Sequence, residues 1–365
     1  MGWLGRFFGK ALLPLLSYAD KRDESQLKSF EDNCNETDGL SGFFRCYSVT
    51  TTDNVKLNTI SFTTNNQNPE KYIINFMGSA TSCFEYSVLN QLMKDAAHGV
   101  TSIAFDYRGI GTDFLGPKSQ HDLVEDGIAQ VQALLNQNVS PENIRLSGHS
   151  LGGAIAIEVA AYFHRKGQKI YVFADRTFAS TQSYLNGHML MIAESFLNPF
   201  ARLYRYKKQW GPGIDDNTAL MIASCHSAVH VLLLPILVVA LLFIILFYVV
   251  LSLLLHFSGW NINLDQCIQD IPADYREYIV VKAPEGQNYF DDEAIPYSGS
   301  LHNHWFLKKE RENKGENVNS RMFFSKTENR RPHLLPLSAL QNDQGQTAAA
   351  VRDAFLKNGA KMTFS

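Results

Sequence analysis

The segment that most constrains the fold is Gly148-His-Ser-Leu-Gly-Gly153, which follows a short apolar run and opens an amphipathic stretch. A serine at the apex of a tight strand-to-helix turn has a strained backbone, and crowding there requires glycine two residues before and two residues after it. Gly148 and Gly152 meet that requirement around Ser150. Such a turn exposes the serine hydroxyl above a sheet and directs the following backbone amides, Leu151 first, to the same space. The sequence therefore predicts a nucleophile on a strand-turn-helix unit.

The chain from Phe43 onward alternates short apolar runs with helical stretches, which is typical of an α/β domain built on a mainly parallel sheet. Phe43–Thr51 and Val55–Thr64 are predicted to form an antiparallel edge, joined around Asp53 and Asn54. The later predicted strands are Tyr72–Phe76, Thr101–Phe105, Ile144–Leu146, Ile170–Phe173, Ile279–Lys282 and Met322–Ser325. The predicted helices are Cys83–Ala97, Ser119–Gln137, Leu151–Arg165 and Thr347–Asn358.

Three segments give the chain a resemblance to the α/β-hydrolase superfamily. They are Gly148–Gly153, Asn75-Phe-Met-Gly-Ser79 after the third strand, and Phe105-Asp-Tyr-Arg-Gly-Ile-Gly111 after the fourth. The resemblance covers Phe43–Phe178 most closely. It implies an α/β-hydrolase fold, with helices flanking a mainly parallel sheet. It also implies that Ser150 is the nucleophile and that the backbone amides of Ser79 and Leu151 form the oxyanion hole.

Serine catalysis needs a histidine that takes the proton and a carboxylate that orients this histidine. In this superfamily the acid follows the serine in the chain and the histidine follows the acid. Asp292 begins Asp292-Glu-Ala-Ile295, which resembles the DxxI turn of the family's catalytic acid, so Asp292 is the predicted acid. Asp291 is a rival because the loop before Asp292 is long. Asp175, directly after the sixth strand, is another, although pairing with Arg176 or capping a helix suits it better.

His333 follows the predicted eighth strand and precedes the last helix, which is the family's position for the catalytic histidine. His302 and His304 come earlier, in a segment, Ser300–Lys309, that is predicted to be helical with both histidines on its surface. His149 adjoins Ser150, and this geometry predicts that its ring points elsewhere. The predicted triad is therefore Ser150, Asp292 and His333.

A long interval without charge lies between the sixth and seventh predicted strands, where these hydrolases insert a cap. No Asp, Glu, Lys or Arg occurs between Asp216 and Asp265, and Val231–Leu255 has no ionisable side chain. These roughly 25 residues make ~37 Å of helix, against ~30 Å of bilayer hydrocarbon. A single crossing would separate Ser150 from His333 and make the triad impossible. The segment is therefore predicted to form a hairpin, to enter one leaflet, or to fold as an apolar cap, with Met189–Tyr206 as a further part of it.

These features divide the chain into three parts. Residues 1–42 form an N-terminal amphipathic segment, 43–182 and 276–365 form the hydrolase core, and 183–275 form the apolar cap or membrane insertion. The N-terminal apolar stretch is short for a signal peptide and is interrupted by Pro14. Two interpretations are open for it: an interfacial helix, or a helix packed on the domain's own core. Arg6 occupies the Ser/Thr position of a myristoylation motif, so no lipid anchor is predicted.

Composition excludes several other classes of function. A net charge of −3 gives no basic surface for nucleic acid. The five cysteines form no CxxC pair, which argues against a zinc or redox site and favours a reducing compartment. No metal or organic cofactor is implied.

The sequence therefore predicts a membrane-associated serine hydrolase that cleaves lipid esters, with a lipid or acyl-ester substrate and a membrane surface as its partners. A peptidase or thioesterase on the same triad is one alternative, and an inactive membrane scaffold is another. The layout is also similar to that of the lipase-like effectors that intracellular bacterial pathogens deliver into host cells. That similarity implies a catalytic domain on the cytosolic side, after secretion into a host cell.

Overall fold

The computed structural model of the chain describes a core sheet, its covering helices and part of the apolar insertion. The described residues are 5–9, 23–36, 41–65, 70–79, 81–110, 116–197, 238–239, 241–284, 291–314, 320–325 and 331–359. Several predicted features lie outside them: Pro14, the end of the Phe105–Gly111 turn, the second half of Met189–Tyr206, and the start of Val231–Leu255.

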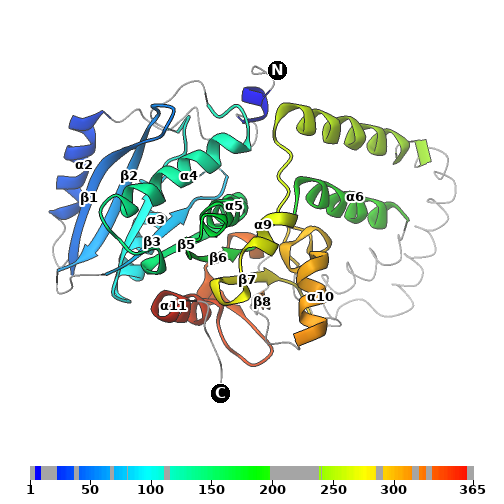
Figure 1. Ribbon diagram of the computed structural model, residues 1–365. Coiled ribbons are helices and arrows are strands. Elements are labelled where there is room, and N and C mark those ends of the chain that lie inside the picture. Colours follow the sequence, from blue (N-terminus) through cyan, green and yellow to red (C-terminus); the bar gives the residue numbers. More distant parts are fainter. Residues whose placement is uncertain are drawn as a thin grey trace, which may run out of the picture.

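Nine strands form one sheet in the order β1-β2-β4-β3-β5-β6-β7-β8-β9 (Figure 1). Strands β3 to β8 pair parallel with one another, whereas the pairs β1 with β2, β2 with β4 and β8 with β9 are antiparallel. The bounds are β1 Gly42–Thr50, β2 Lys56–Thr64, β3 Lys71–Phe76, β4 Val100–Phe105, β5 Ile144–His149, β6 Tyr171–Asp175, β7 Arg276–Val281, β8 Ser320–Ser325 and β9 Leu340–Gln341. Every residue of β4, β6 and β7 is buried, as expected for strands covered on both faces.

Helices cover both faces of this sheet. On one face α5 (Leu151–Arg165) packs against α4 (Gln120–Leu135) and α9 (Asp265–Asp270). On the other face α3 (Tyr86–Ala96) and α11 (Ala348–Asn358) are joined by the buried ion pair of Asp95 and Arg352. Alternate residues of β6 serve the two cores: Val172 and Ala174 belong to the cluster with α5, and Phe173 to the cluster with α11. Further helices in the described part of the chain are α2 (Glu24–Asn35), α6 (Thr181–Leu197) and α10 (Trp305–Lys314).

The register of the central strands sets the position of the site. Gly148 and His149 at the end of β5 pair with Ala174 and Asp175 at the end of β6, and Phe76 of β3 pairs with Gly148. The carboxyl ends of β3, β5 and β6 therefore lie side by side, so the loops that follow them converge on one edge of the sheet.

The apolar insertion leaves this edge through α6 and returns through a helix that we name the apolar helix, Leu241–Ser258 (Figure 1). The two helices are in contact, because the Ser252 hydroxyl donates a hydrogen bond to the side chain of Gln182. At their base the Thr181 amide donates to the Ile262 carbonyl over 2.9 Å. The chain therefore leaves the core and returns to it at adjacent positions. The division of the chain into 1–42, 43–182 with 276–365, and 183–275 stays an interpretation. The structure adds that α9, which lies within 183–275, packs on the core helix α5.

Candidate active site

Ser150 stands at the apex of the turn between β5 and α5, in a conformation that few non-glycine residues adopt. Its φ is 55° and its ψ is −123°. The strain is held on both sides: the Ser150 amide donates to the Asp175 carbonyl over 2.9 Å, and the Thr177 hydroxyl donates to the Ser150 carbonyl over 2.7 Å. A strained residue fixed by its neighbours in this way is typical of functional sites.

The flanking glycines are required by close backbone approach. A Cβ on Gly148 would lie 2.3 Å from the Gly152 carbonyl oxygen, and a Cβ on Gly152 would lie 2.2 Å from the Phe76 carbonyl oxygen. Both contacts are with backbone atoms, which cannot move aside without moving the strand and helix. The turn predicted from the sequence is therefore the turn that the chain forms.

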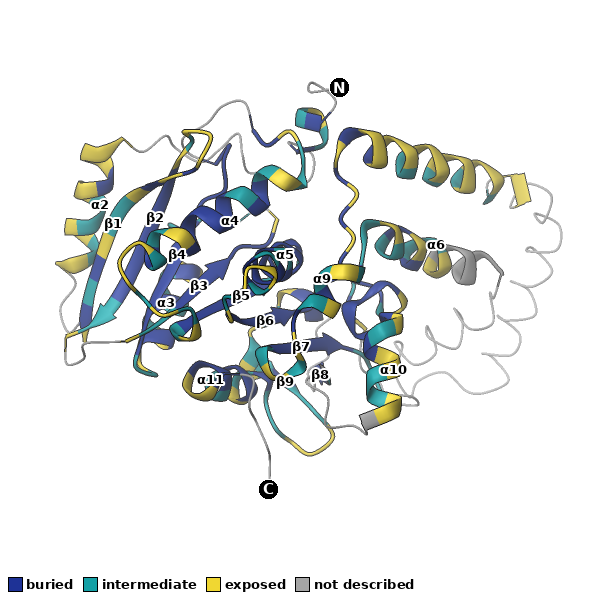
Figure 2. Cartoon of the chain, in the orientation of Figure 1, coloured by how far each residue is buried: buried dark blue, intermediate teal, exposed yellow. Residues whose placement is uncertain are grey.

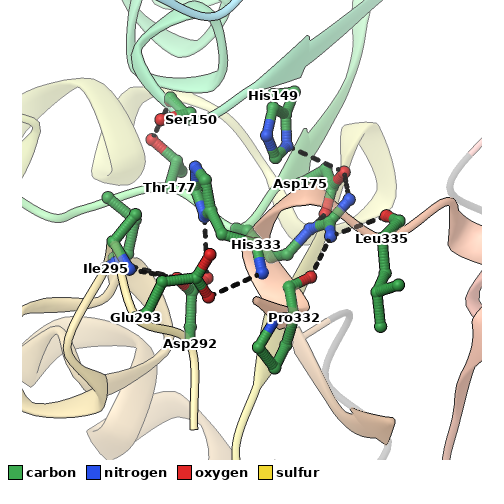
Figure 3. A network of polar contacts seen from close by, with 12 residues as sticks. His149, Ser150, Asp175, Thr177, Asp292, Glu293, Ile295, Pro332, His333 and Leu335 are labelled. Atoms are coloured by element: carbon green, nitrogen blue, oxygen red, sulfur yellow. Dashed lines mark hydrogen bonds and ion pairs between the residues drawn. The ribbon is translucent and has the colours of Figure 1, made fainter. Parts of the chain in front are cut away.

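Asp292 and His333 lie together beside this turn, although 41 positions separate them in the chain. The Asp292 carboxylate Oδ2 is 3.0 Å from Nδ1 of His333, and both side chains are buried. Its other oxygen accepts the amides of Ala294 and Ile295 over 2.9 and 2.8 Å, so the carboxylate is fixed by its own tight turn. The His333 amide in turn donates to Glu293 over 3.0 Å. With Nδ1 at the carboxylate, the opposite edge of the imidazole faces the Ser150 turn (Figure 3).

The proposed oxyanion-hole amides lie on the two segments that border Ser150. Leu151 is the first residue of α5, where helix geometry leaves amides without partners in the preceding turn. Gly78 precedes Ser79, and the position of a Cβ on Gly78 is 3.7 Å from the Ser150 Cβ. The loop after β3 therefore approaches the serine closely, as the sequence comparison with the superfamily implies for Ser79. The catalytic roles of Ser150, Asp292, His333, Ser79 and Leu151 stay predictions.

The rival acids make other contacts. Asp291 is exposed and accepts the Ala283 amide over 2.8 Å. Asp175 binds the guanidinium of Arg176 through both carboxylate oxygens, each over 2.7 Å, as its alternative interpretation expected. Burial alone would raise the pKa of Asp175, but the Arg176 charge and the hydrogen bonds from His149 and Arg176 hold it below its usual value. In the part of the chain that the structure describes, the carboxylate that bonds to the His333 ring is that of Asp292.

The prediction that His302 and His304 lie on a helix surface is wrong, because both side chains are buried. They fall in and just after a short 3-10 turn, Leu301–Asn303, and α10 begins only at Trp305. His304 bonds to Asp265, and the carbonyl of His302 accepts the Arg311 guanidinium over 2.6 Å.

We expect His302 to make the protein less stable in acid. Burial, followed by the charges of Arg311 and Lys282, lowers its pKa from 6.5 to about 3. A lowered histidine pKa stabilises the fold above pH 6.5, and this contribution falls by up to about 1.4 kcal/mol per pH unit between pH 6.5 and 3. Urea unfolding at pH 4, 5.5 and 7 should therefore show a smaller pH dependence for His302→Gln than for the wild type. If the free energies of unfolding of the wild type and of His302→Gln depend equally on pH, the lowered pKa of His302 is contradicted.

His149 is the site residue whose part the sequence did not reveal. Its ring lies 4.6 Å from the His333 ring, centroid to centroid, and its Nδ1 is 3.1 Å from the Asp175 carboxylate (Figure 3). It also lines a cavity of about 230 Å³ together with Gly78 and Arg176. His149 thus points away from the Ser150 hydroxyl, as predicted, but packs against the predicted base. Its position directly before the serine was the available signal.

Among the residues that the structure describes, no three His, Cys, Asp or Glu side chains are grouped to hold a metal ion. The side chains of Ser150, His333 and Asp292 bring a hydroxyl, an imidazole and a carboxylate to the described site.

Comparison with known proteins identifies the class. A model of the alpha/beta hydrolase family matches residues 77–297, and the chain belongs to this family. The fold prediction is confirmed.

Two named relatives match part of the chain. The chain is 26% identical over 188 residues, 50% of its length, to a multifunctional-autoprocessing repeats-in-toxin protein of Vibrio cholerae. It is 30% identical over 122 residues, 32% of its length, to the protein of that name from Vibrio vulnificus. The matches cover only 4% and 2% of those toxins.

Two solved structures are similar at low identity. An alpha-beta hydrolase from Vibrio vulnificus has a TM-score of 0.48 and 17% identity, over 88% of this chain and 86% of that one. An esterase from Pyrococcus furiosus has a TM-score of 0.45 and 16% identity, over 78% of this chain and 81% of that one.

Proposed function

We propose that the protein is a membrane-associated serine hydrolase that cleaves the carboxylic esters of lipids. The observation that carries the catalytic part is the buried Asp292–His333 pair, 3.0 Å apart, beside the strained Ser150 turn. Each element supports the arrangement separately: Ser150 lies at the apex of the turn, the acid is fixed by two amides, and the imidazole is bonded to the acid with its opposite edge toward the Ser150 turn.

The proposed reaction passes through an acyl-enzyme. His333 Nε2 takes the proton of the Ser150 hydroxyl while the oxygen attacks the ester carbonyl, and Asp292 stabilises the imidazolium. The amides of Ser79 and Leu151 donate to the oxyanion that forms. The carbonyl re-forms as the C–O bond of the ester breaks, and the imidazolium donates its proton to the leaving alcohol. Water activated by His333 then attacks the acyl-enzyme, which releases the carboxylic acid and restores Ser150.

The apolar helix supports a lipid substrate and a membrane partner. Among the described residues, Leu241–Ser258 is the one helix long and apolar enough to cross a membrane, and only 11% of it is buried (Figure 2). The exposed fractions of Phe243 and Phe247 are 67% and 62%. Water does not favour such a surface, and a contiguous exposed apolar patch marks an interaction site.

The pattern of exposure favours lipid over a protein groove. Large apolar side chains are exposed at consecutive positions rather than only at helical spacing, as at Leu242 with Phe243 and Leu253 with Leu254. A protein groove covers one stripe of a helix, whereas lipid surrounds it. The helix is about 27 Å long at 1.5 Å per residue. Because α6 and the apolar helix leave and rejoin the core together, hairpin or one-leaflet insertion keeps Ser150 and His333 on one side.

The N-terminal helix, residues 5–9, lies at the base of this hairpin. The Trp260 indole donates to the Gly5 carbonyl over 2.8 Å, and Gly9 approaches Trp260 and Pro117 closely. The helix thus packs on its own domain through its glycines, while Phe7 is 60% exposed on its other side. Both interpretations of this segment therefore have a physical basis. We propose that Phe7 extends the membrane-binding surface formed by the apolar helix.

Removal of exposed aromatic rings tests the membrane part. The double variant Phe243→Gln/Phe247→Gln should float with liposomes at less than about one third of the wild-type recovery, because each ring contributes roughly 1.5–3 kcal/mol of apolar transfer. Its hydrolysis of a soluble short-chain ester should stay within about twofold. The matched control is Tyr86→Gln/Trp305→Gln, which removes two rings that are 79% and 55% exposed elsewhere. Equal recovery of the two variants would contradict membrane docking through this helix.

Hydrolysis of lipid dispersed in vesicles tests the substrate part. The wild type should release fatty acid from these vesicles, and the Phe243→Gln/Phe247→Gln variant should lose about tenfold in this rate while it keeps the soluble-ester rate. Vesicle hydrolysis that is unchanged in this variant would contradict a membrane-bound substrate. Turnover of soluble esters but not of vesicle lipid by the wild type would contradict a lipid substrate.

The relatives support a proposal about where the protein acts. The two Vibrio proteins are toxins by name, and we propose by this similarity that the chain is secreted into a host cell with its catalytic domain on the cytosolic side. Detection of the epitope-tagged chain in the membrane fraction of infected cells tests this proposal.

A further inference from the structure

We propose that Arg176 is a positioning residue that holds the loop of the catalytic histidine in place. This inference rests on the proposed function, because it concerns the role of His333 as base. Arg176 directly follows β6 and its side chain is buried. Its Nη1 donates to the carbonyl of Pro332 over 2.6 Å and to the carbonyl of Leu335 over 2.9 Å. These two carbonyls lie on either side of His333, in and after the 3-10 turn Pro332–Leu334.

The Arg176 guanidinium is itself held in place by hydrogen bonds from its other two nitrogens. Its Nε and Nη2 donate to the two oxygens of Asp175, each over 2.7 Å. Two hydrogen bonds from Arg176 therefore connect the end of β6, whose Asp175 carbonyl accepts the Ser150 amide, to a loop 156 positions away, and the two bonds to the Asp175 carboxylate fix the guanidinium that makes them. Arginine suits this task because its donors have a rigid fork geometry, whereas lysine offers one flexible ammonium.

The backbone of Arg176 also indicates a constrained position. Its φ is 46°, in the left-handed region, and its amide donates to the Ile279 carbonyl over 3.1 Å. Non-glycine residues in such conformations cost about 1–3 kcal/mol and persist where the surroundings fix them. Here the amide is held by β7 and the side chain by Asp175 and the His333 loop, so the guanidinium has a fixed origin and direction.

The other contacts of the His333 loop leave a specific task for Arg176. Glu293 accepts the His333 amide and Asp292 binds the ring, so the acid loop fixes the residue itself. Arg176 fixes the chain before and after it. His149 packs against the His333 ring and binds the same Asp175 carboxylate (Figure 3). Asp175 thus orients two groups: the Arg176 guanidinium, which holds the His333 loop, and the His149 ring, which contacts the His333 ring. Small misplacements of a catalytic group can lower a rate about 100-fold.

Substitution of Arg176 tests this role on the full chain. Arg176→Met should lower kcat for a soluble ester by about 100-fold and Arg176→Lys by about tenfold, with KM within about twofold in both, because substrate binding is not altered. The matched control is Arg276→Lys. Arg276 is equally buried, pairs with Glu310 over 2.6 Å, and lies at the first residue of β7, at the opposite edge of the sheet. The control should keep kcat within about twofold.

The outcomes separate this proposal from the proposed function. If the wild type has no Ser150-dependent turnover, the proposed function fails. If the wild type turns over and the Arg176→Lys and Arg276→Lys variants have equal kcat when corrected for folded protein, the positioning role is overturned. The lysine variant keeps a buried charge opposite Asp175, so it gives an answer even where the methionine variant does not fold. The order wild type, lysine, methionine in kcat at unchanged KM supports the proposal.

Discussion

Substitution of Ser150 by alanine is expected to lower kcat for ester hydrolysis by about 10³- to 10⁶-fold, because no other group replaces the attacking oxygen. Binding energy and the oxyanion-hole amides remain in the variant, so KM should change by less than about threefold. Ser150 is only partly exposed and its carbonyl and amide, not its hydroxyl, make the structural hydrogen bonds of the turn. The thermal unfolding midpoint should therefore change little.

The control for this substitution is Ser147→Ala. Ser147 lies three positions earlier in β5 and is buried, and its hydroxyl accepts from Arg352 over 3.3 Å. It shares the strand and the residue type, but its hydroxyl is bonded to Arg352 of α11, so kcat should stay within about threefold. Initial rates on a soluble ester measure both variants. Retention of wild-type kcat by Ser150→Ala would exclude the nucleophile assignment.

Asp292→Asn should lower kcat by about 10⁴-fold with little change in KM. The amide of asparagine can still accept from Ala294 and Ile295, so the turn should persist. It would present an N–H group toward His333 Nδ1, which favours the tautomer with the proton on Nε2 and thereby removes the base. The expected loss of kcat therefore comes from the protonation state of His333 and not from a change in the shape of the turn.

Asp291→Asn is the matched control, because this neighbour is exposed and accepts only the Ala283 amide in the described hydrogen bonds. Its kcat should remain within about twofold of the wild type. Full kinetic curves for the two variants separate the rival acids. A larger loss of kcat for Asp291→Asn than for Asp292→Asn would reverse the assignment.

Local chemistry explains why much of the fold could be predicted. Buried parallel strands must be apolar over their whole length, and the serine turn tolerates only glycine at its crowded positions, so both leave patterns in the sequence. The residues at which the strands begin and end were less predictable. β7 begins at Arg276 and not at the predicted Ile279, because Arg276 and Glu277 are buried with partners, Glu310 and Arg321, that lie far along the chain. A charged residue that is neutralised by a distant partner does not show its burial in a local pattern.

The same reason limits prediction of the site. Chain order and the DxxI turn were sufficient to suggest Asp292 and His333, which the structure brings together. Nothing near Arg176 indicates that its partners are the Pro332 and Leu335 carbonyls, since backbone acceptors carry no residue identity. The burial of His302 and His304 was missed because their segment forms a 3-10 turn and not the predicted helix.

The most direct test of the central claim is to locate the covalent adduct of a fluorophosphonate, which reacts with the activated serine of serine hydrolases. The protein should gain one adduct by intact mass, and peptide mapping should place it on Ser150, with no adduct in Ser150→Ala and a much slower reaction in Asp292→Asn. An adduct on another residue, or labelling that survives Ser150→Ala, would contradict the account.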